Sequence, residues 1–395
     1  MKNIGLLISQ LHSGGAERVV SRVSKILEEK YNIYVILFED SNMVYEHGGT
    51  LVNLDIPAKD GALAKVSLLL KRASKLKKKK KELKLDLVIS FLDSPNMVNI
   101  LSRVKGCKSA VSIRNYSASE NRGSLLGKIT NALYKMLYKR ADKVVPVTKV
   151  IEDLYIKNYN IPKEKLKVIY NPYDIDEIES QMKKDCDFDL SKTEGKTTFI
   201  TVGRQMYQKG YWHLIKAYKK LHDENKDTAL IMVGMIDEKV VNLIEKFNLE
   251  DSIVLTDRHP NPFSFIAKSD IYVLSSLFEG FPNSMTEAMV CALPIIAADC
   301  KSGPREILAP DTPIDTVCED IEEAEFGIIT KPLENEEEWK SEALTEGEHH
   351  LYTAMKSMAE DKELREKYAR LAKERSESFG YGICKENFID LIENI

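Results

Sequence analysis

The chain has 395 residues, of which 43% are hydrophobic and 30% charged, and its formal net charge is −4 at pH 7. This length exceeds that of one ordinary domain, and the proportions of hydrophobic and charged residues are those of a folded globular chain. We therefore expect two domains with separate cores. The small negative charge argues against a dedicated nucleic-acid-binding protein. The six cysteines form no C-x-x-C pair and no metal-ligand spacing, so free thiols are expected.

Targeting signals are not visible in the sequence. The apolar run at residues 1–9 is too short for a secretory signal, and no small-residue cleavage site follows it. No apolar stretch reaches the roughly 18 residues of a transmembrane helix. We therefore expect a cytoplasmic protein.

Short β-rich apolar runs alternate with helical stretches along the chain, which is typical of parallel sheets built from βαβ units. In the first half we expect strands at 3–9, 33–38, 85–91, 110–114, 143–147 and 167–170. In the second half we expect them at 198–203, 229–234, 253–255, 271–274 and 295–298. The predicted fold class is α/β, with two doubly wound, Rossmann-like domains in series.

The boundary between the domains is predicted after the last strand of the first half. The sequence Asn-Pro-Tyr-Asp at 171–174 breaks that strand, and a charged stretch at 183–185 precedes the next one. We expect an N-terminal domain at 1–178 and a C-terminal domain at 179–380. The last helix, 381–395, has no strand after it and is expected to cross back to the first domain.

One motif joins a strand, a loop and the start of a helix. The strand at 271–274 is followed by the loop 279–282, and Asn283 is a plausible N-cap for the next helix. The backbone N–H groups of Ser284, Met285 and Thr286 would then be unpaired. Such a helix start favours an anion, for example a diphosphate.

Glu279 and Glu287 flank this expected anion site. Carboxylates beside a phosphate need neutral hydroxyl donors as partners, so sugar and ribose hydroxyls suit them. Their E-x7-E spacing, within EGFPNSMTEAM, resembles the donor site of retaining GT-B glycosyltransferases of family 4. The resemblance implies two Rossmann-like domains facing across a cleft, and transfer of a sugar with retention from a nucleotide diphosphate donor to an acceptor hydroxyl. It also implies that Glu279 contacts the donor sugar and Glu287 the ribose.

Two cations follow the first strand of the second domain. Val202-Gly203-Arg204 and Lys209-Gly210 lie at the carboxyl end of that strand, where open α/β sheets bind ligands. A guanidinium and an ammonium at this edge can neutralise a diphosphate leaving group. In the resembling family these positions do so, which implies that role for Arg204 and Lys209.

In the first domain, Gly14 and Gly15 follow a strand and open a helix, so their N–H groups can approach a ligand closely. They resemble the family's glycine loop, which faces the donor phosphates and the acceptor. Many members carry a histidine beside the reacting sugar, whereas Arg114 and Asn115 stand at that place here. An arginine cannot be a general base near neutral pH, so we assign it to acceptor or phosphate contact. His12 is placed on the acceptor side too, although a solvent-facing loop histidine fits the same sequence.

The mechanism implied is front-face attack, in which the departing diphosphate takes the acceptor proton. Arg204, Lys209 and the helix start stabilise the leaving group, and Glu279 and Glu287 position the donor. The Asp-x-Asp spacings at 174–176 and 185–187 lie near the hinge, so no metal is predicted and no cofactor is needed. The donor expected from the resemblance is a UDP-sugar carrying a hexose or an N-acetylhexosamine.

The acceptor is predicted from a basic helix at 64–84. Val66, Leu69, Leu70 and Ala73 share one face, and Arg72 and the lysines between Lys71 and Lys84 crowd its later turns. Such helices favour anionic membrane surfaces, so we expect a peripheral position on the inner face of the cell membrane and a polyprenyl-diphosphate-linked glycan acceptor. A second basic stretch runs from 128 to 140. A solvated lysine-rich face explains the same residues equally well.

Three other classes fit parts of the pattern. A nucleotide-sugar epimerase of the same fold would bind a similar donor without an acceptor. A noncatalytic nucleotide-sugar-binding protein would keep donor affinity without turnover. A two-domain solute-binding protein also pairs βαβ domains, but it would need an export signal.

Overall fold

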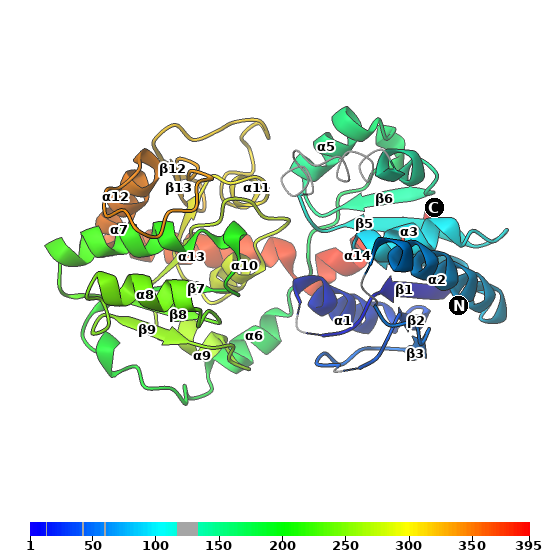
Figure 1. Ribbon diagram of the computed structural model, residues 1–395, viewed down its shortest axis with the longest axis horizontal. Helices are drawn as coiled ribbons and strands as arrows, with labels where there is room; N and C mark the ends of the chain where they lie inside the picture. The colour runs from blue at the N-terminus through cyan, green and yellow to red at the C-terminus, as the bar shows by residue number, and fades with distance from the viewer. Residues whose placement is uncertain (13, 42, 59–60, 117–132) are drawn as a thin grey trace. The chain divides into compact units, whose positions relative to one another are not determined.

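The computed structural model describes residues 1–12, 14–41, 43–58, 61–116 and 133–395 (Figure 1). The chain divides into two compact units. Unit 1 comprises Met1–Tyr173 and Phe379–Ile395, and unit 2 comprises Asp174–Ser378. Within the described part, no helix combines the length and apolar character of a membrane span.

Unit 1 contains a parallel sheet of six strands in the order β3-β2-β1-β4-β5-β6. Their bounds are β1 Asn3–Ile8, β2 Asn32–Leu37, β3 Thr50–Asn53, β4 Leu87–Phe91, β5 Lys108–Ile113 and β6 Lys143–Pro146. The order reverses between β1 and β4. In doubly wound sheets the carboxyl ends of such neighbouring strands flank the ligand crevice.

Helices cover both faces of this sheet. They are α1 Gly15–Leu27, α2 Ala62–Glu82, α3 Asp93–Leu101, α5 Lys149–Tyr159 and α14 Tyr381–Glu393, with a short 3₁₀ turn at Lys163–Lys165. Successive side chains of a strand point to opposite faces. Accordingly Leu6 belongs to the same apolar cluster as Val20 of α1 and Phe388 of α14, whereas Leu7 belongs to that of Leu76 of α2.

The C-terminal helix α14 is part of unit 1. Its Phe388, Leu391 and Ile392 are buried in the same cluster as the inner face of α1. Just before it, the Phe379 carbonyl accepts a 2.9 Å hydrogen bond from the Tyr173 backbone N–H. The segment that leaves unit 1 and the segment that returns to it are therefore paired (Figure 1).

Unit 2 contains a sheet of seven strands in the order β12-β13-β11-β10-β7-β8-β9, in which only β12 runs antiparallel. Their bounds are β7 Thr197–Val202, β8 Thr228–Val233, β9 Ile253–Thr256, β10 Ile271–Leu274, β11 Ile295–Ala298, β12 Ile321–Ala324 and β13 Gly327–Thr330. The order reverses between β7 and β10. This places the expected ligand crevice of unit 2 after those two strands.

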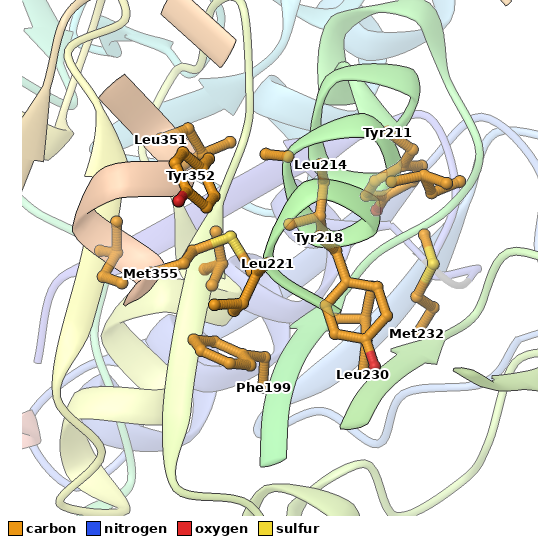
Figure 2. Close-up of a cluster of buried hydrophobic side chains, with 14 of the residues drawn as sticks. Phe199, Tyr211, Leu214, Tyr218, Leu221, Leu230, Met232, Leu351, Tyr352 and Met355 are labelled. Atoms are coloured by element: carbon orange, nitrogen blue, oxygen red, sulfur yellow. The ribbon is translucent and has the colours of Figure 1, made fainter. Parts of the chain in front are cut away.

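The helices of unit 2 enclose its sheet. They are α6 Ile175–Met182, α7 Tyr211–Glu224, α8 Glu238–Lys246, α9 Phe263–Ile266, α10 Asn283–Val290, α11 Pro304–Leu308, α12 Glu346–Glu360 and α13 Lys362–Ser376. Short 3₁₀ turns lie at Ser191–Thr193, Tyr207–Lys209 and Glu377–Phe379. Figure 2 shows part of the core, where side chains of α7 such as Leu221 meet those of α12 such as Met355.

The predicted α/β class with two doubly wound sheets is confirmed, but some strand predictions are wrong. Residues 167–170 form no strand, because only Leu166 makes an isolated bridge, to Val144. The structure adds β3, β12 and β13. Both β3 and β12 lie at sheet edges and are partly exposed, so their sequences lack the apolar run of a central strand.

Candidate active site

Two loops meet at the switch point of the unit 2 sheet. The 3₁₀ turn Tyr207–Lys209 follows β7, and its Lys209 carbonyl accepts a 2.9 Å hydrogen bond from Ser275 Oγ after β10. Gly210 has a φ of 58°, and a Cβ there would lie 2.4 Å from the Ser275 carbonyl oxygen. Only glycine permits this approach. The two loops thus form one fixed floor at the carboxyl ends of β7 and β10.

Lys209 and Glu279 form an ion pair on this floor. Lys209 Nζ lies 2.7 Å from Glu279 Oε1, and Ser276 Oγ donates to the same oxygen at 2.6 Å. Burial opposes the charge on Lys209, but the neighbouring carboxylate raises the pKa of Lys209 above its ordinary value. The two predicted site residues are therefore brought together, and each offsets the other's charge.

The helix α10 begins at this floor, one residue earlier than the predicted cap implies. Pro282 occupies the N-cap and Asn283 is the first helical residue, so the prediction that Asn283 is the N-cap is wrong. The Thr286 N–H donates to the Pro282 carbonyl at 3.1 Å, so it is not unpaired as predicted. The amides of Ser284 and Met285 precede this first intrahelical bond and have no carbonyl within the helix to donate to.

Tyr272 ties the first turn of α10 to the sheet. Its hydroxyl, on β10, lies 2.7 Å from Ser284 Oγ. Burial raises the pKa of Tyr272, and the nearby charge of Lys209 opposes that shift. The sequence did not identify Tyr272 and Ser276. A tyrosine in a short buried strand is typical of the core, and this loop serine belongs to no recognised motif.

Two further predicted residues of unit 2 lie near these loops in sequence but differ in exposure. Arg204 follows β7 directly and its side chain is exposed. Glu287 lies on α10 and is buried. The Arg204 side chain is therefore open to solvent, whereas that of Glu287 is enclosed.

In unit 1, Gly14 is the N-cap of α1 and Gly15 its first residue. Gly14 has an extended backbone with φ −92°, so it is not required for a left-handed turn. A Cβ on Gly14 would instead lie 2.0 Å from the Glu17 carboxylate. Glu17 thus covers the helix start, and an anionic ligand would have to displace it. His12, just before this loop, is half-buried.

Arg114 and Asn115 follow β5 but have different surroundings. Asn115 is exposed. Arg114 is only 7% exposed, and its Nε and Nη1 donate to Ser112 Oγ at 2.7 Å and Asn171 Oδ1 at 2.6 Å. Burial lowers the pKa of Arg114 to about 10. The sequence predicted Arg114 and Asn115 together as acceptor-side residues. In the structure the Asn115 amide is exposed, whereas the Arg114 guanidinium is buried.

One aspartate of each Asp-x-Asp spacing has a structural partner. Asp174 caps α6 by accepting from the Glu177 N–H at 3.1 Å, and Asp187 pairs with His259 at 2.8 Å. In the residues that the structure describes, no cluster of three His, Cys, Asp or Glu side chains is placed to hold a metal ion.

Comparison with known proteins places this chain in a family. The family described as Glycosyltransferase Family 4 matches residues 13–177, and that described as Glycosyl transferases group 1 matches residues 182–337. An uncharacterized glycosyltransferase of Methanocaldococcus jannaschii is 33% identical over 325 residues, which are 79% of this chain and 80% of the relative.

Two further proteins are similar over nearly the whole chain. One is the N-acetylgalactosamine-N,N'-diacetylbacillosaminyl-diphospho-undecaprenol 4-alpha-N-acetylgalactosaminyltransferase of Campylobacter jejuni, 29% identical over 389 residues and 96% of each chain. The other is HepE of Anabaena, whose crystal structure in complex with UDP and glucose matches with a TM-score of 0.73 at 17% identity, covering 99% of each chain.

The two doubly wound sheets and these matches define a glycosyltransferase of the GT-B fold. The chain belongs to glycosyltransferase family 4. The predicted family, fold and enzyme class are thereby confirmed.

Proposed function

We propose that this enzyme transfers an N-acetylhexosamine or a hexose from a UDP-sugar to a hydroxyl of a polyprenyl-diphosphate-linked glycan, with retention of configuration, in surface glycan synthesis. The observation that carries the proposal is the Lys209–Glu279 pair at the floor from which α10 starts. A cation, a carboxylate and a helix start then lie within one unit. These are the groups that a diphosphate and its attached sugar need.

In the proposed mechanism the diphosphate binds at the first turn of α10. Lys209 and the exposed side chain of Arg204 neutralise the charge that develops as the diphosphate departs. Glu279 accepts hydrogen bonds from the donor sugar, and Glu287 from the ribose. The acceptor hydroxyl attacks the face from which the diphosphate leaves, and a phosphate oxygen takes its proton. Asp174 and Asp187 are engaged elsewhere, so the proposal includes no metal.

The lipid-linked acceptor rests on the relatives. The Campylobacter jejuni relative is named for a diphospho-undecaprenol acceptor and is 29% identical over 96% of each chain. A second Campylobacter jejuni relative, 23% identical over 78% of this chain, is named for a PP-undecaprenol acceptor and the transfer of N-acetyl-D-galactosamine. Both names favour an N-acetylhexosamine as the sugar transferred here.

A peripheral membrane position rests on the exposed face of α2. Val66 and Leu70 are 58% and 59% exposed, and Lys77 and Lys81 follow at helical spacing on the same side. Each lysine near an anionic surface contributes about 1 kcal/mol. A double change of Lys77 and Lys81 to Glu should reduce flotation with anionic vesicles, whereas the same change at Lys226 and Lys268 in unit 2 should not.

The structure corrects two members of the predicted basic face. Arg72 is buried and its Nη2 donates to the Ile56 carbonyl at 2.8 Å, while its guanidinium lies over the Phe38 ring. Lys80 is 1% exposed and bonded to Asn99. Neither contributes to a membrane surface. In the second basic stretch, residues 128–132 lie outside the described part of the chain.

The test of the proposed function is calorimetric binding of UDP-, GDP- and ADP-sugars in EDTA to the wild type and to Glu287→Ala. We expect one UDP-sugar to bind, and Glu287→Ala to weaken it by roughly 10- to 100-fold through loss of the ribose contacts. Asp176→Ala, which removes an exposed carboxylate on α6, is the matched control and should bind as the wild type does. Equal donor affinity of the wild type and Glu287→Ala would contradict the assigned donor site. Turnover of the donor without an acceptor would favour the nucleotide-sugar epimerase.

A further inference from the structure

Arg114 is a buried cation whose hydrogen-bond acceptors among the described residues are neutral oxygens, and its guanidinium lies 5.4 Å from the centroid of the Phe91 ring. Its two hydrogen-bonded nitrogens donate to a hydroxyl and an amide oxygen, Ser112 Oγ and Asn171 Oδ1. Among the described residues, the ionisable side chains that influence Arg114 are Cys384 and Tyr173, and neither is a carboxylate. The third nitrogen, Nη2, is buried and has no acceptor among the described residues. Buried charges in proteins are normally paired, so this arrangement calls for a missing anion.

The surroundings of Arg114 are fixed by a chain of buried polar groups. Ser112 Oγ donates to the Val145 carbonyl at 3.3 Å, which leaves its lone pair for Arg114 Nε. The Ser112 carbonyl accepts from Asn96 Nδ2 at 2.9 Å, and Asn96 Oδ1 accepts from Ser90 Oγ at 2.8 Å. Ser90, Asn96 and Ser112 are all fully buried. The guanidinium is therefore preorganised and not free to swing to another partner.

Asn171 determines whether this charge is available. An aspartate has the same shape as an asparagine and would form a short, charge-assisted contact with Arg114 Nη1. The neutral amide makes the hydrogen bond without supplying a counter-charge. The site thus retains a positive charge at the carboxyl edge of the unit 1 sheet, next to the exposed Asn115.

We propose that Arg114 Nη2 binds a phosphoryl oxygen of a substrate, and that Asn171 is a positioning residue whose neutral amide keeps the Arg114 charge available for it. This inference rests on the proposed function, which supplies a diphosphate in the lipid-linked acceptor and another in the donor. The chemistry is the same for both sources. The experiment below separates them.

The test uses calorimetric titration of inorganic pyrophosphate into the full chain after the donor site has been saturated with UDP. We expect the wild type to bind, and Asn171→Asp to bind at least about tenfold more weakly, because the new carboxylate satisfies Arg114. Asn160→Asp makes the same charge change at an exposed position of unit 1 and should bind as the wild type does. The melting temperature of Asn171→Asp should be equal to or higher than that of the wild type, which excludes misfolding as the cause.

Two results would overturn the inference. One is a wild type that binds no pyrophosphate in the presence of UDP, together with an Asn171→Asp protein that binds UDP as the wild type does. The other is an Asn171→Asp protein that binds it as the wild type does, since an ordered water would then satisfy Nη2. Because the titration needs no acceptor, pyrophosphate binding that depends on residue 171 supports the inference even if glycosyl transfer to the proposed acceptor fails.

Kinetics then assign the source of the phosphoryl group. If it belongs to the acceptor, Asn171→Asp raises the KM for a diphosphate-linked acceptor and leaves the donor KM and kcat unchanged. If it belongs to the donor, the donor KM rises instead. A purely structural role of residue 171 would move neither KM, since the aspartate keeps the shape and the hydrogen bond.

Discussion

Lys209 Nζ and Glu279 Oε1 lie 2.7 Å apart, although the two residues follow different strands, β7 and β10, of the unit 2 sheet. Burial alone would favour a neutral lysine, and the Glu279 carboxylate reverses this by raising the pKa of Lys209. In the proposed mechanism Lys209 neutralises the leaving group and Glu279 binds the donor sugar. The positive charge of Lys209 thus depends on Glu279. Loss of either residue should impair both steps.

A first prediction concerns Glu279→Gln. Without the carboxylate, burial is unopposed and the pKa of Lys209 falls, so the alkaline limit of kcat/KM should move to lower pH than in the wild type. The kcat at neutral pH should also fall, by roughly 100-fold. The pH dependence of kcat/KM measures both effects.

Ser276→Ala is the control for that experiment. It removes one hydrogen bond to Glu279 and leaves both charges in place. Its alkaline limit should match that of the wild type. A Glu279→Gln enzyme with an unchanged alkaline limit would show that Lys209 does not depend on Glu279.

A second prediction compares two buried tyrosines near this floor. The Tyr272 hydroxyl pairs with Ser284 Oγ, whereas the buried Tyr211 hydroxyl has no partner among the described residues. Tyr272→Phe should cost about 1 kcal/mol of unfolding free energy and weaken UDP binding, because the first turn of α10 loses its tie to the sheet. Tyr211→Phe should be neutral or stabilising by up to about 1 kcal/mol. Urea unfolding and UDP titration of both variants measure this, and equal losses in the two would contradict it.

A third prediction concerns Lys80. Burial lowers the pKa of Lys80 to about 8, below the unfolded value near 10.5. Between these two pH values the unfolded chain binds more protons than the folded one, so the unfolding free energy should rise as pH increases from 8 to 10.5. Lys80→Met should remove this slope and stabilise the protein at neutral pH by about 1–3 kcal/mol. Lys77→Met, on the exposed face of α2, should leave the slope intact.

A fourth prediction concerns the buried carboxylate of Glu348. It accepts from His213 Nδ1 at 2.6 Å, lies 3.3 Å from Lys216 Nζ and accepts the Thr345 backbone N–H at 2.8 Å. Burial would raise the pKa of Glu348, but these hydrogen bonds and charges hold it below its ordinary value. Its contribution to stability is therefore present at neutral pH and lost as pH falls below about 4.

Glu348→Leu should accordingly destabilise unit 2 by about 3–5 kcal/mol at pH 7, because it leaves Lys216 and His213 buried without their partner. The difference from the wild type should shrink in acid, where Glu348 is protonated in both folding states. Urea unfolding at several pH values measures it. An equal difference at all pH values would contradict the electrostatic explanation.

The sequence predicted the parts of the fold that depend on local pattern. Strands such as β4 and β8 are continuous buried apolar runs, and both sheets follow from them. The E-x7-E motif located Glu279 and Glu287, and the switch point of the unit 2 sheet lies between the strands that precede Lys209 and Glu279. These features need no knowledge of distant contacts.

What the sequence did not predict depends on partners far along the chain. The burial of Arg114 requires Asn171, which lies 57 residues away, and the partner of Tyr272 lies on the next helix. Lys80 is different, because its position four residues after Leu76 and seven after Ala73 places it on the buried face of α2. The helical period alone would therefore have excluded Lys80 from the predicted basic face of α2.

The membership of α14 in unit 1 has a consequence for the order of folding during synthesis. A ribosome completes Asp174–Ser378 as one uninterrupted segment, whereas the cluster that includes Val20 and Phe388 must wait for α14. Domains generally fold as units as they emerge. Unit 2, although second in the sequence, is therefore the first that can be finished, and the nascent unit 1 holds an open apolar face until its last helix arrives.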